Sequence, residues 1–398
     1  MNQVISILIV GAGGYGNYYV DALLNHEHKE GFLIAGVVDP YPSACRNLDK
    51  LKQMNVPFFT TLEEFYSKNS ADLAIISSPI HFHKNQVCYA LSKGSNVLCE
   101  KPVSATVQEA QAMLKAQKEA GKFVSIGFQW SYAKAIHNLK KDMIDGILGK
   151  PIRFKTLILW PRNEEYYKRG WAAKIKDNSG NWILDSIANN AAAHYLHNML
   201  YLLGDSMDTS EYPEKISAEL YRANKIENYD TVCARITTKK GTELSFYATH
   251  ATRELLDPTF CYEFENAIVT FHTGSSIQAK FKDGMVKEYG NPDENLYSKL
   301  NNAIDEVKGI SKSPCTIETA LPHLICINGI QESMRITDFP EDLIQYDSTS
   351  KLIYVEGLNE VLKDCYDNWT FPAQAKVSWA KSGKEVDLNG YDYFKGNL

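Results

Sequence analysis

The run Ile5–Gly16, ISILIVGAGGYG, decides the fold of this 398-residue chain. Its first half is almost entirely apolar, which is typical of a strand buried in a parallel sheet. Its second half has the G-x-G-x-x-G spacing, in which the glycines allow a tight turn, a close approach to a pyrophosphate and close packing of the next helix. The N–H groups at the start of that helix favour a phosphate. The run therefore predicts a strand–turn–helix unit that binds a dinucleotide through Gly11, Gly13, Gly14, Tyr15 and Gly16.

A carboxylate ends the second apolar run, at Asp39, 23 residues after Gly16. A carboxylate at this place hydrogen-bonds a ribose 2′-hydroxyl and repels a 2′-phosphate. Pro40 and Tyr41 follow it, where an NADP-binding chain would offer an arginine. We therefore expect NAD in preference to NADP. The alternative, a glycine turn without ligand and a surface Asp39, is disfavoured because turn, strand, helix and acid coincide as the dinucleotide fingerprint requires.

The order of apolar runs predicts two domains. Up to Gly127, strand-like runs at 5–10, 33–39, 72–77, 96–99 and 123–127 alternate with helix-like segments at 14–25, 41–53, 83–93 and 107–120. This rhythm indicates a doubly wound parallel sheet covered on both faces. Beyond Phe128, longer alternating runs at 152–160, 231–238, 243–252 and 261–271 indicate a mostly antiparallel α+β domain. We expect an NAD-binding Rossmann domain at 1–127 and a substrate-binding and oligomerisation domain at 128–398.

Composition narrows the classes of partner. The formal charge of −6 attracts neither nucleic acid nor an anionic membrane surface. The eight cysteines are scattered, without the close pairs of zinc or redox sites, so we expect reduced thiols and no metal. The apolar run Val4–Val10 is too short to span a membrane and is not followed by a cleavage pattern. These features favour a cytoplasmic protein.

Two further motifs follow the third and fourth of these strands: Ser78–His83, SPIHFH, and Cys99–Pro102, CEKP. Together with the glycine turn, they resemble the Gfo/Idh/MocA oxidoreductases. Segments 62–65 and 144–149 extend the resemblance over most of the chain. It implies a Rossmann domain followed by a C-terminal domain with a large open sheet, through which a homodimer or homotetramer forms.

The resemblance also implies roles for residues of these motifs. The lysine of the family's Glu-Lys-Pro turn faces the reacting carbon, which makes Lys101 catalytic, and the neighbouring motifs bring Ser78, Pro79, His83 and Glu100 to the cofactor. Lys101 has a physical case of its own, because ligands bind at the carboxyl edge of such sheets and an ammonium there polarises a hydroxyl or carbonyl oxygen. The alternatives are a solvated lysine and, for His83, a helix cap.

The family usually carries an Asp, and a His four residues later, in a helix that matches Asp185–His197 in two ways. Counting from Asp185 places Asn189 at the histidine position. Counting back from Gly204 places His194 there and Asn190 at the aspartate position.

Helical geometry favours the second alignment. At about 100° per residue, Asn190, His194 and His197 fall within about 60° of one another, and Asp185 lies opposite His194. We therefore expect His194 to transfer the proton, with Asn190 as its partner and Asp185 as a helix N-cap. An asparagine orients an imidazole but does not stabilise an imidazolium as a carboxylate does. The alternative is a structural histidine, and no carboxylate or cysteine joins the two histidines to hold a metal.

The segment 160–171 is dense in aromatic residues and arginines. Aromatic rings stack on sugars and guanidinium groups hold hydroxyls or a carboxylate, although an oligomer interface is enriched in the same residues. His250 and Arg253 are further pocket candidates. The expected substrate contacts are Lys101, Gln129, Trp160, Arg162, Tyr167, Arg169, Trp171, His194 and His197.

These features predict an NAD(P)-dependent oxidoreductase acting on CH–OH, which transfers hydride between a sugar, inositol or related polyol and NAD. Lys101 and His194 stand at the reacting centre. One alternative is a sugar-modifying enzyme that uses tightly bound NAD for transient oxidation during hydrolysis or epimerisation. Another is a non-catalytic NAD-bound sensor or scaffold.

Overall fold

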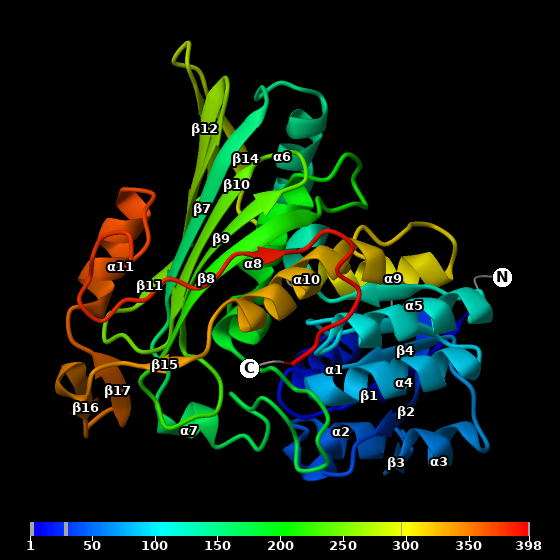
Figure 1. The fold of residues 1–398 in the computed structure, drawn as a ribbon. Coiled ribbons are helices and arrows are strands. Elements are labelled where there is room, and N and C mark those ends of the chain that lie inside the picture. Colours follow the sequence, from blue (N-terminus) through cyan, green and yellow to red (C-terminus); the bar gives the residue numbers. More distant parts are fainter. Residues whose placement is uncertain (1–3, 28–30, 296, 397–398) are drawn as a thin grey trace. The chain divides into compact units, whose positions relative to one another are not determined.

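The computed structural model describes residues 4–27, 31–295 and 297–396. The chain divides into two compact units, which interleave along the sequence (Figure 1). The first unit comprises Met1–Ser104, Gln108–Tyr132 and Asn295–Ala320, and the second comprises Ala105–Val107, Ala133–Glu294 and Leu321–Leu398. The sequence suggested a single boundary after Gly127, whereas a segment near residue 300 also belongs to the first unit.

The sheet of the first unit has six parallel strands among the described residues, in the order β3-β2-β1-β4-β5-β6. This order confirms the predicted Rossmann sheet. It reverses beside β1, so the carboxyl ends of β1 and β4 flank the crevice in which doubly wound folds bind ligands. The strands are β1 (Ile5–Val10), β2 (Phe32–Val38), β3 (Phe58–Phe59), β4 (Leu73–Ile76), β5 (Asn96–Cys99) and β6 (Val124–Ile126).

Helices of the first unit pack on this sheet, with α1 on β1 and α4 on β4 and β5. The helix expected at 41–53 was wrong in its first half, because the chain forms a short 3₁₀ turn at Pro42–Ala44 and the Arg46 N–H donates to the Asn17 side chain at 2.7 Å. The helices are α1 (Gly16–Leu24), α2 (Leu48–Gln53), α3 (Leu62–Tyr66), α4 (Ile80–Ser92), α5 (Val107–Ala120) and α9 (Ser298–Val307).

Helix α9 completes the core of the first unit although it lies far along the sequence. Leu300, Ala303 and Ile304 are spaced i, i+3 and i+4 and bury one face of α9 in the hydrophobic core, where α9 contacts β4 and β5. Beyond α9, the Ile126 N–H of β6 donates to the Cys315 carbonyl at 2.8 Å, so this returning segment also covers the edge of the sheet.

The second unit is built on a large mixed sheet in the order β14-β13-β12-β11-β7-β10-β9-β8-β15, with β18 also paired to β8. Most pairs are antiparallel, and β7–β10 and β8–β15 are parallel. This confirms the predicted α+β architecture. The strands are β7 (Pro151–Leu159), β8 (Pro213–Arg222), β9 (Thr231–Thr238), β10 (Glu243–Thr249), β11 (Leu256–Phe264), β12 (Ala267–His272), β13 (Ile277–Phe281), β14 (Val286–Gly290), β15 (Thr337–Asp338) and β18 (Val386–Asp387).

The prediction of a single strand over the run 261–271 was wrong. Strand β11 ends at Phe264, and the two residues Glu265 and Asn266 turn the chain into the antiparallel β12. Both turn residues donate backbone hydrogen bonds to the segment 148–150, which holds the turn in place.

Helices and a small hairpin complete the second unit. Helix α11 packs on β7 and β10, and α8 packs on β7 and α6. No helix in the described part of the chain is long and apolar enough to cross a membrane. The elements are α6 (Lys134–Ile144), α7 (Glu164–Tyr167), α8 (Ala193–Leu202), α10 (Ile317–Ser333, in this unit from Leu321), α11 (Leu358–Asp367), β16 (Ile344–Asp347) and β17 (Leu352–Val355).

Candidate active site

The glycine turn between β1 and α1 is as tight as the sequence predicts. Gly11 has φ +81°, a conformation that favours glycine. A Cβ on Gly16 would lie 2.0 Å from the Gly11 carbonyl oxygen, so helix and turn touch backbone to backbone. Gly14 has φ +50° and nothing within 4 Å of its Cβ position, which leaves the outer side of the turn open.

Asp39 stabilises the turn from the end of β2. Its Oδ2 accepts the N–H of Ala12 at 2.8 Å and of Gly13 at 3.3 Å, and its Oδ1 accepts the Tyr41 N–H at 2.8 Å. Within the residues that the structure describes, the N–H groups of Gly14 and Tyr15 donate to no protein acceptor. These free donors at the start of α1, with the open space over Gly14, fit the pyrophosphate of a dinucleotide.

The motif that follows β4 is tied to the glycine turn and to the Glu-Lys-Pro turn. The Ser77 hydroxyl donates to the Gly11 carbonyl at 2.6 Å. The His83 ring lies between two carbonyl oxygens, with Nε2 2.9 Å from Ser78 and Nδ1 2.8 Å from Pro102. Burial lowers the pKa of His83, although these carbonyls act against that shift. Only 1% of the His83 surface is exposed, so this buried ring links the Ser78 segment to the Glu-Lys-Pro turn.

The other residues of these motifs lie at the carboxyl ends of β4 and β5. The Ser78 hydroxyl donates to the Gln86 side chain at 2.5 Å, and Pro79 precedes the first turn of α4. Lys101 is half-buried, and its peptide bond to Pro102 is cis. The structure therefore brings the glycine turn, Asp39 and the Glu-Lys-Pro turn to one edge of the sheet.

Glu100 is buried and hydrogen-bonded at both carboxylate oxygens. Oε1 accepts the Tyr19 hydroxyl at 2.6 Å and an ion pair from Lys299, and Oε2 accepts the Lys101 N–H at 3.2 Å. A Cβ on residue 127 would lie 2.7 Å from Oε1, so Gly127 makes room for the carboxylate. Burial and the Glu100 charge raise the pKa of Tyr19 well above its usual value, which keeps that hydroxyl protonated.

Lys299 is a buried residue beside the glycine turn that sequence reasoning missed. It lies on α9 with 2% of its surface exposed, although lysine is ordinarily a surface residue. Its neighbours in sequence carry no motif. The only signal was indirect, since α9 has an apolar stripe and Lys299 stands directly before its first member, Leu300.

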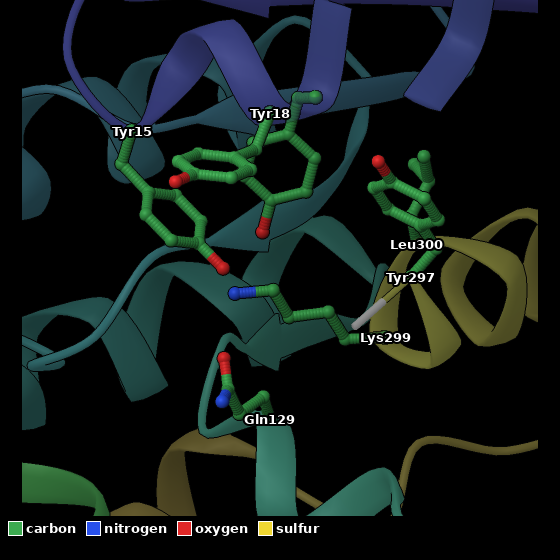
Figure 2. A pocket seen from close by; sticks show the side chains of 7 residues that line it. Tyr15, Tyr18, Gln129, Tyr297, Lys299 and Leu300 are labelled. Carbon is green, nitrogen blue, oxygen red and sulfur yellow. The ribbon is translucent and has the colours of Figure 1, made fainter. Parts of the chain in front are cut away.

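A cavity of about 150 Å³ lies beside the glycine turn. Figure 2 shows the Lys299 ammonium directed toward the Tyr15 hydroxyl, with the Gln129 amide facing the same space. Burial raises the pKa of Tyr15. The residues that line the cavity are Tyr15, Tyr18, Tyr19, Gln129, Tyr297, Lys299 and Leu300. Gln129, expected from the sequence to contact substrate, thus lies near the cofactor turn.

In the second unit, the segment before α8 is a π-helical turn, Ile187–Ala191, and not the α-helix expected from Asp185 onward. The Ala192 N–H donates to the Ile187 carbonyl at 2.8 Å, five residues back. Ser186, whose hydroxyl accepts the Asn189 N–H at 3.2 Å, is the N-cap, so the expected capping role of Asp185 was wrong.

The π turn brings Asp185 to Asn190. The Asn190 amide donates to Asp185 Oδ1 at 2.9 Å, and Oδ2 accepts the Ala173 N–H at 2.5 Å. The angular argument that separated Asp185 from this helix face assumed about 100° per residue, and a π turn breaks that rule. His194 is half-buried at the start of α8. Burial lowers the pKa of His197 well below its usual value, and 1% of this residue is exposed, so it belongs to the core.

The aromatic and basic residues that follow β7 form one cluster in the second unit. The Arg162 guanidinium lies 5.5 Å from the Trp160 ring and 5.1 Å from the Tyr166 ring. The Arg169 guanidinium lies 4.0 Å from Tyr166 and 5.0 Å from Trp171. Among the described residues, no carboxylate forms an ion pair with either arginine. Cation–π contacts hold both groups within an aromatic surface.

His250 and Tyr167 adjoin this cluster. The His250 Nδ1 lies 2.7 Å from the Trp160 carbonyl, and burial, with the charges of Arg162 and Arg169, lowers the pKa of His250 to about 3. The Tyr167 hydroxyl and His250 Nε2 are buried without a partner in the described chain. The Arg253 guanidinium lies 5.8 Å from the centre of the Tyr354 ring.

Comparison with known proteins identifies the first unit. Residues 5–128 match the Gfo/Idh/MocA family, described as "Oxidoreductase family, NAD-binding Rossmann fold". This confirms the resemblance stated from the sequence motifs, and it establishes an NAD-binding Rossmann fold at the N-terminal end of the chain.

Curated relatives have different activities. The chain is 25% identical over 205 residues to a 2,7-anhydro-N-acetylneuraminate hydratase of Mediterraneibacter gnavus, an alignment that covers 51% of this chain and 50% of that protein. It is 25% identical over 171 residues to an inositol 2-dehydrogenase of Corynebacterium glutamicum, which covers 42% and 49%. The chain thus spans about half the length of the curated relatives that it matches.

The fold also has solved counterparts that extend beyond the matched residues 5–128. The WlbA dehydrogenase of Bordetella pertussis, in complex with NADH and UDP-GlcNAcA, superposes with a TM-score of 0.68 at 21% identity and covers 82% of this chain and 95% of its own. At this identity the likeness establishes the fold.

Proposed function

We propose that the protein moves a hydride between a CH–OH group of a sugar, inositol or related polyol and NAD, because residues 5–128 match the Gfo/Idh/MocA oxidoreductase family. One observation carries this proposal. Glu100, His83 and Ser77 connect the lysine-bearing turn to the glycine turn, so Lys101 is held at the same sheet edge as the dinucleotide-binding backbone.

NAD is the cofactor in this proposal. Asp39 presents its carboxylate at the turn, where a 2′-phosphate would be repelled. Arg46 is the first arginine after β2 in the sequence. Its guanidinium forms an ion pair with the Asp21 carboxylate at 2.7 Å. Two features thus favour the unphosphorylated dinucleotide.

Lys101 and His194 carry the proposed proton chemistry. Bound NAD supplies the hydride acceptor. The Lys101 ammonium polarises the substrate oxygen, and the His194 imidazole accepts the hydroxyl proton. Asn190 orients this part of the helix, and its contact with Asp185 brings a carboxylate to the turn that precedes His194.

The substrate class follows from the cluster after β7. Trp160, Tyr166 and Trp171 offer aromatic faces for a sugar ring, and Arg162 and Arg169 offer guanidinium groups that no carboxylate of the described chain neutralises. A hydroxylated substrate, including a sugar acid, satisfies both features.

The test is a screen of sugars, polyols and sugar acids with the purified protein and NAD, followed by NADH fluorescence. Lys101→Met and His194→Ala should each lower turnover at least about 100-fold while NAD affinity stays within about threefold. Turnover at the parental rate in both variants would refute the assignment of these residues.

Similarity to a hydratase supports a second candidate. This candidate is a sugar-modifying enzyme that uses tightly bound NAD: it oxidises its substrate transiently, and the hydride returns before product leaves. Protein that is purified with bound NAD and converts its substrate without accumulating NADH would favour this candidate over net dehydrogenation.

A further inference from the structure

A buried ion pair joins three separate parts of the first unit. The Lys299 ammonium of α9 pairs with the Glu100 carboxylate and donates to the Gly127 carbonyl at 3.2 Å. It also lies 4.5 Å from the centre of the Tyr15 ring and 5.3 Å from that of Tyr19. One side chain thereby contacts the glycine turn, the start of α1 and the Glu-Lys-Pro turn.

The Glu100 carboxylate is fixed between these groups. Tyr19 and Lys299 occupy Oε1, and the backbone N–H of Lys101 occupies Oε2. A buried charge is stable only when it is paired and hydrogen-bonded, so removal of the Lys299 charge leaves an uncompensated anion one residue from Lys101.

Lys299 stays charged in this setting. Burial lowers its pKa, but the Glu100 and Tyr15 side chains raise it, and the net shift is upward. The pair is therefore an ammonium–carboxylate pair whose two charges cancel inside the unit.

We propose that Lys299 is a positioning residue for Lys101: through Glu100 it holds the Lys101 backbone at the sheet edge, and it cancels the Glu100 charge that would otherwise act on the Lys101 side chain. This inference rests on the proposed role of Lys101 in catalysis. The same ammonium supports Tyr15 at the cofactor turn, so the two parts of the site share one anchor.

A purely structural pair would affect stability and leave the titration of Lys101 unchanged. The positioning role predicts charge-dependent shifts of opposite sign. In Lys299→Met, the unpaired Glu100 anion favours the protonated form of Lys101 and raises its titration midpoint. In Glu100→Gln, the unpaired Lys299 ammonium disfavours that form and lowers the midpoint.

The experiment is competitive acetylation of the NAD-free protein at a series of pH values, with the reactivity of the Lys101 peptide read by mass spectrometry. We expect shifts of about 0.5–1.5 pH units, upward for Lys299→Met and downward for Glu100→Gln. Lys299→Arg keeps the charge and should restore the parental midpoint. Lys308→Met, at the residue after α9, is the matched control and should not move it.

NAD titration by calorimetry gives a second readout. Lys299→Met should weaken NAD binding about 3- to 10-fold, because Tyr15 loses its cation–π contact. If Lys299→Met does not fold, the Lys101 midpoint in Glu100→Gln is the measurement that tests the proposal. Parental midpoints in every folded variant of the pair overturn the proposal.

The outcomes separate this inference from the proposed function. Shifted Lys101 midpoints in a protein that oxidises no sugar or polyol would uphold the positioning role and refute the dehydrogenase. Unchanged Lys101 midpoints, together with loss of turnover in Lys101→Met, would refute the positioning role and uphold the dehydrogenase.

Discussion

The Asn190 amide donates to the Asp185 carboxylate at 2.9 Å, across a π-helical turn that separates the two residues by five positions. This hydrogen bond places the Asp185 carboxylate against the turn that precedes His194. Asp185 is almost fully buried, and its two oxygens accept hydrogen bonds from the Asn190 amide and the Ala173 N–H.

Asn190→Asp should destabilise the protein. The substitution removes a donor from Asp185 and sets two carboxylates against each other in a buried turn. We expect the free energy of unfolding at neutral pH to fall by about 1–3 kcal/mol, as measured by urea denaturation. Asn190→Ser, which keeps a small donor, is the control and should lose less. Parental stability of the aspartate variant would contradict the contact.

Gly16→Ala should abolish tight NAD binding. Its Cβ would lie 2.0 Å from the Gly11 carbonyl oxygen, so the turn or the helix must shift. We expect at least about a 30-fold rise in the Kd for NAD, measured by calorimetry. Gly170→Ala, where nothing lies within 4 Å of the Cβ position and the backbone is not left-handed, is the control for an added methyl group. Equal NAD affinity in the two variants would show that the close approach is unimportant.

Asp39→Ser should weaken the preference for NAD over NADP. The variant loses the repulsion of a 2′-phosphate together with the acceptor for the Ala12 and Gly13 N–H groups. We expect the ratio of Kd values for the two cofactors to fall about 10-fold or more. Asp39→Asn keeps an oxygen acceptor without the charge, which separates the electrostatic effect from support of the turn. An unchanged ratio in both variants would remove Asp39 from cofactor selection.

His250 should make stability depend on pH. Its pKa is lowered from 6.5 to about 3 in the folded protein, chiefly by burial. Below pH 6.5 the unfolded chain therefore binds a proton that the folded chain does not, so the His250 contribution to stability is complete above pH 6.5 and declines as the pH falls toward 3.

The decline should approach about 1.4 kcal/mol per pH unit below the unfolded pKa. The measurement is the free energy of unfolding in urea from neutral to acidic pH. His250→Asn keeps a donor for the Trp160 carbonyl but does not titrate, so its curve should be flatter by this amount. Parallel curves would mean that His250 takes up its proton over the same pH range in the folded and unfolded states.

Local patterns in the sequence predicted the parts of the fold that depend on local physics. The bounds of β5, α5 and β9 were predicted correctly because apolar periodicity and flanking polar residues set them. The glycine turn was recognisable because its backbone demands glycine at fixed spacing. The π turn at Ile187–Ala191 was missed, because α and π hydrogen bonding fit the same residues and tertiary contacts such as Asp185 with Ala173 decide between them.

Lys299 was unpredictable for a different reason. Its partner Glu100 lies 199 residues earlier in the sequence, and the residues around neither of them predict that the two pair. A lysine in an amphipathic helix is read as solvated, and only the return of α9 to the first unit makes it buried. The roles of Lys101 and His194 rest on motif and geometry within their own units, and they stay predictions until the variants are measured.

The return of α9 has a consequence for biosynthesis. The ribosome delivers the six strands of the first sheet by Ile126, but Leu300, Ala303 and Ile304 of its core come much later. Until then the nascent Rossmann domain exposes apolar surface and carries Glu100 without its counter-ion, so most of the second unit is made while the first is unfinished. A fragment that ends at the apparent domain boundary should accordingly need chaperones and aggregate where the full chain folds.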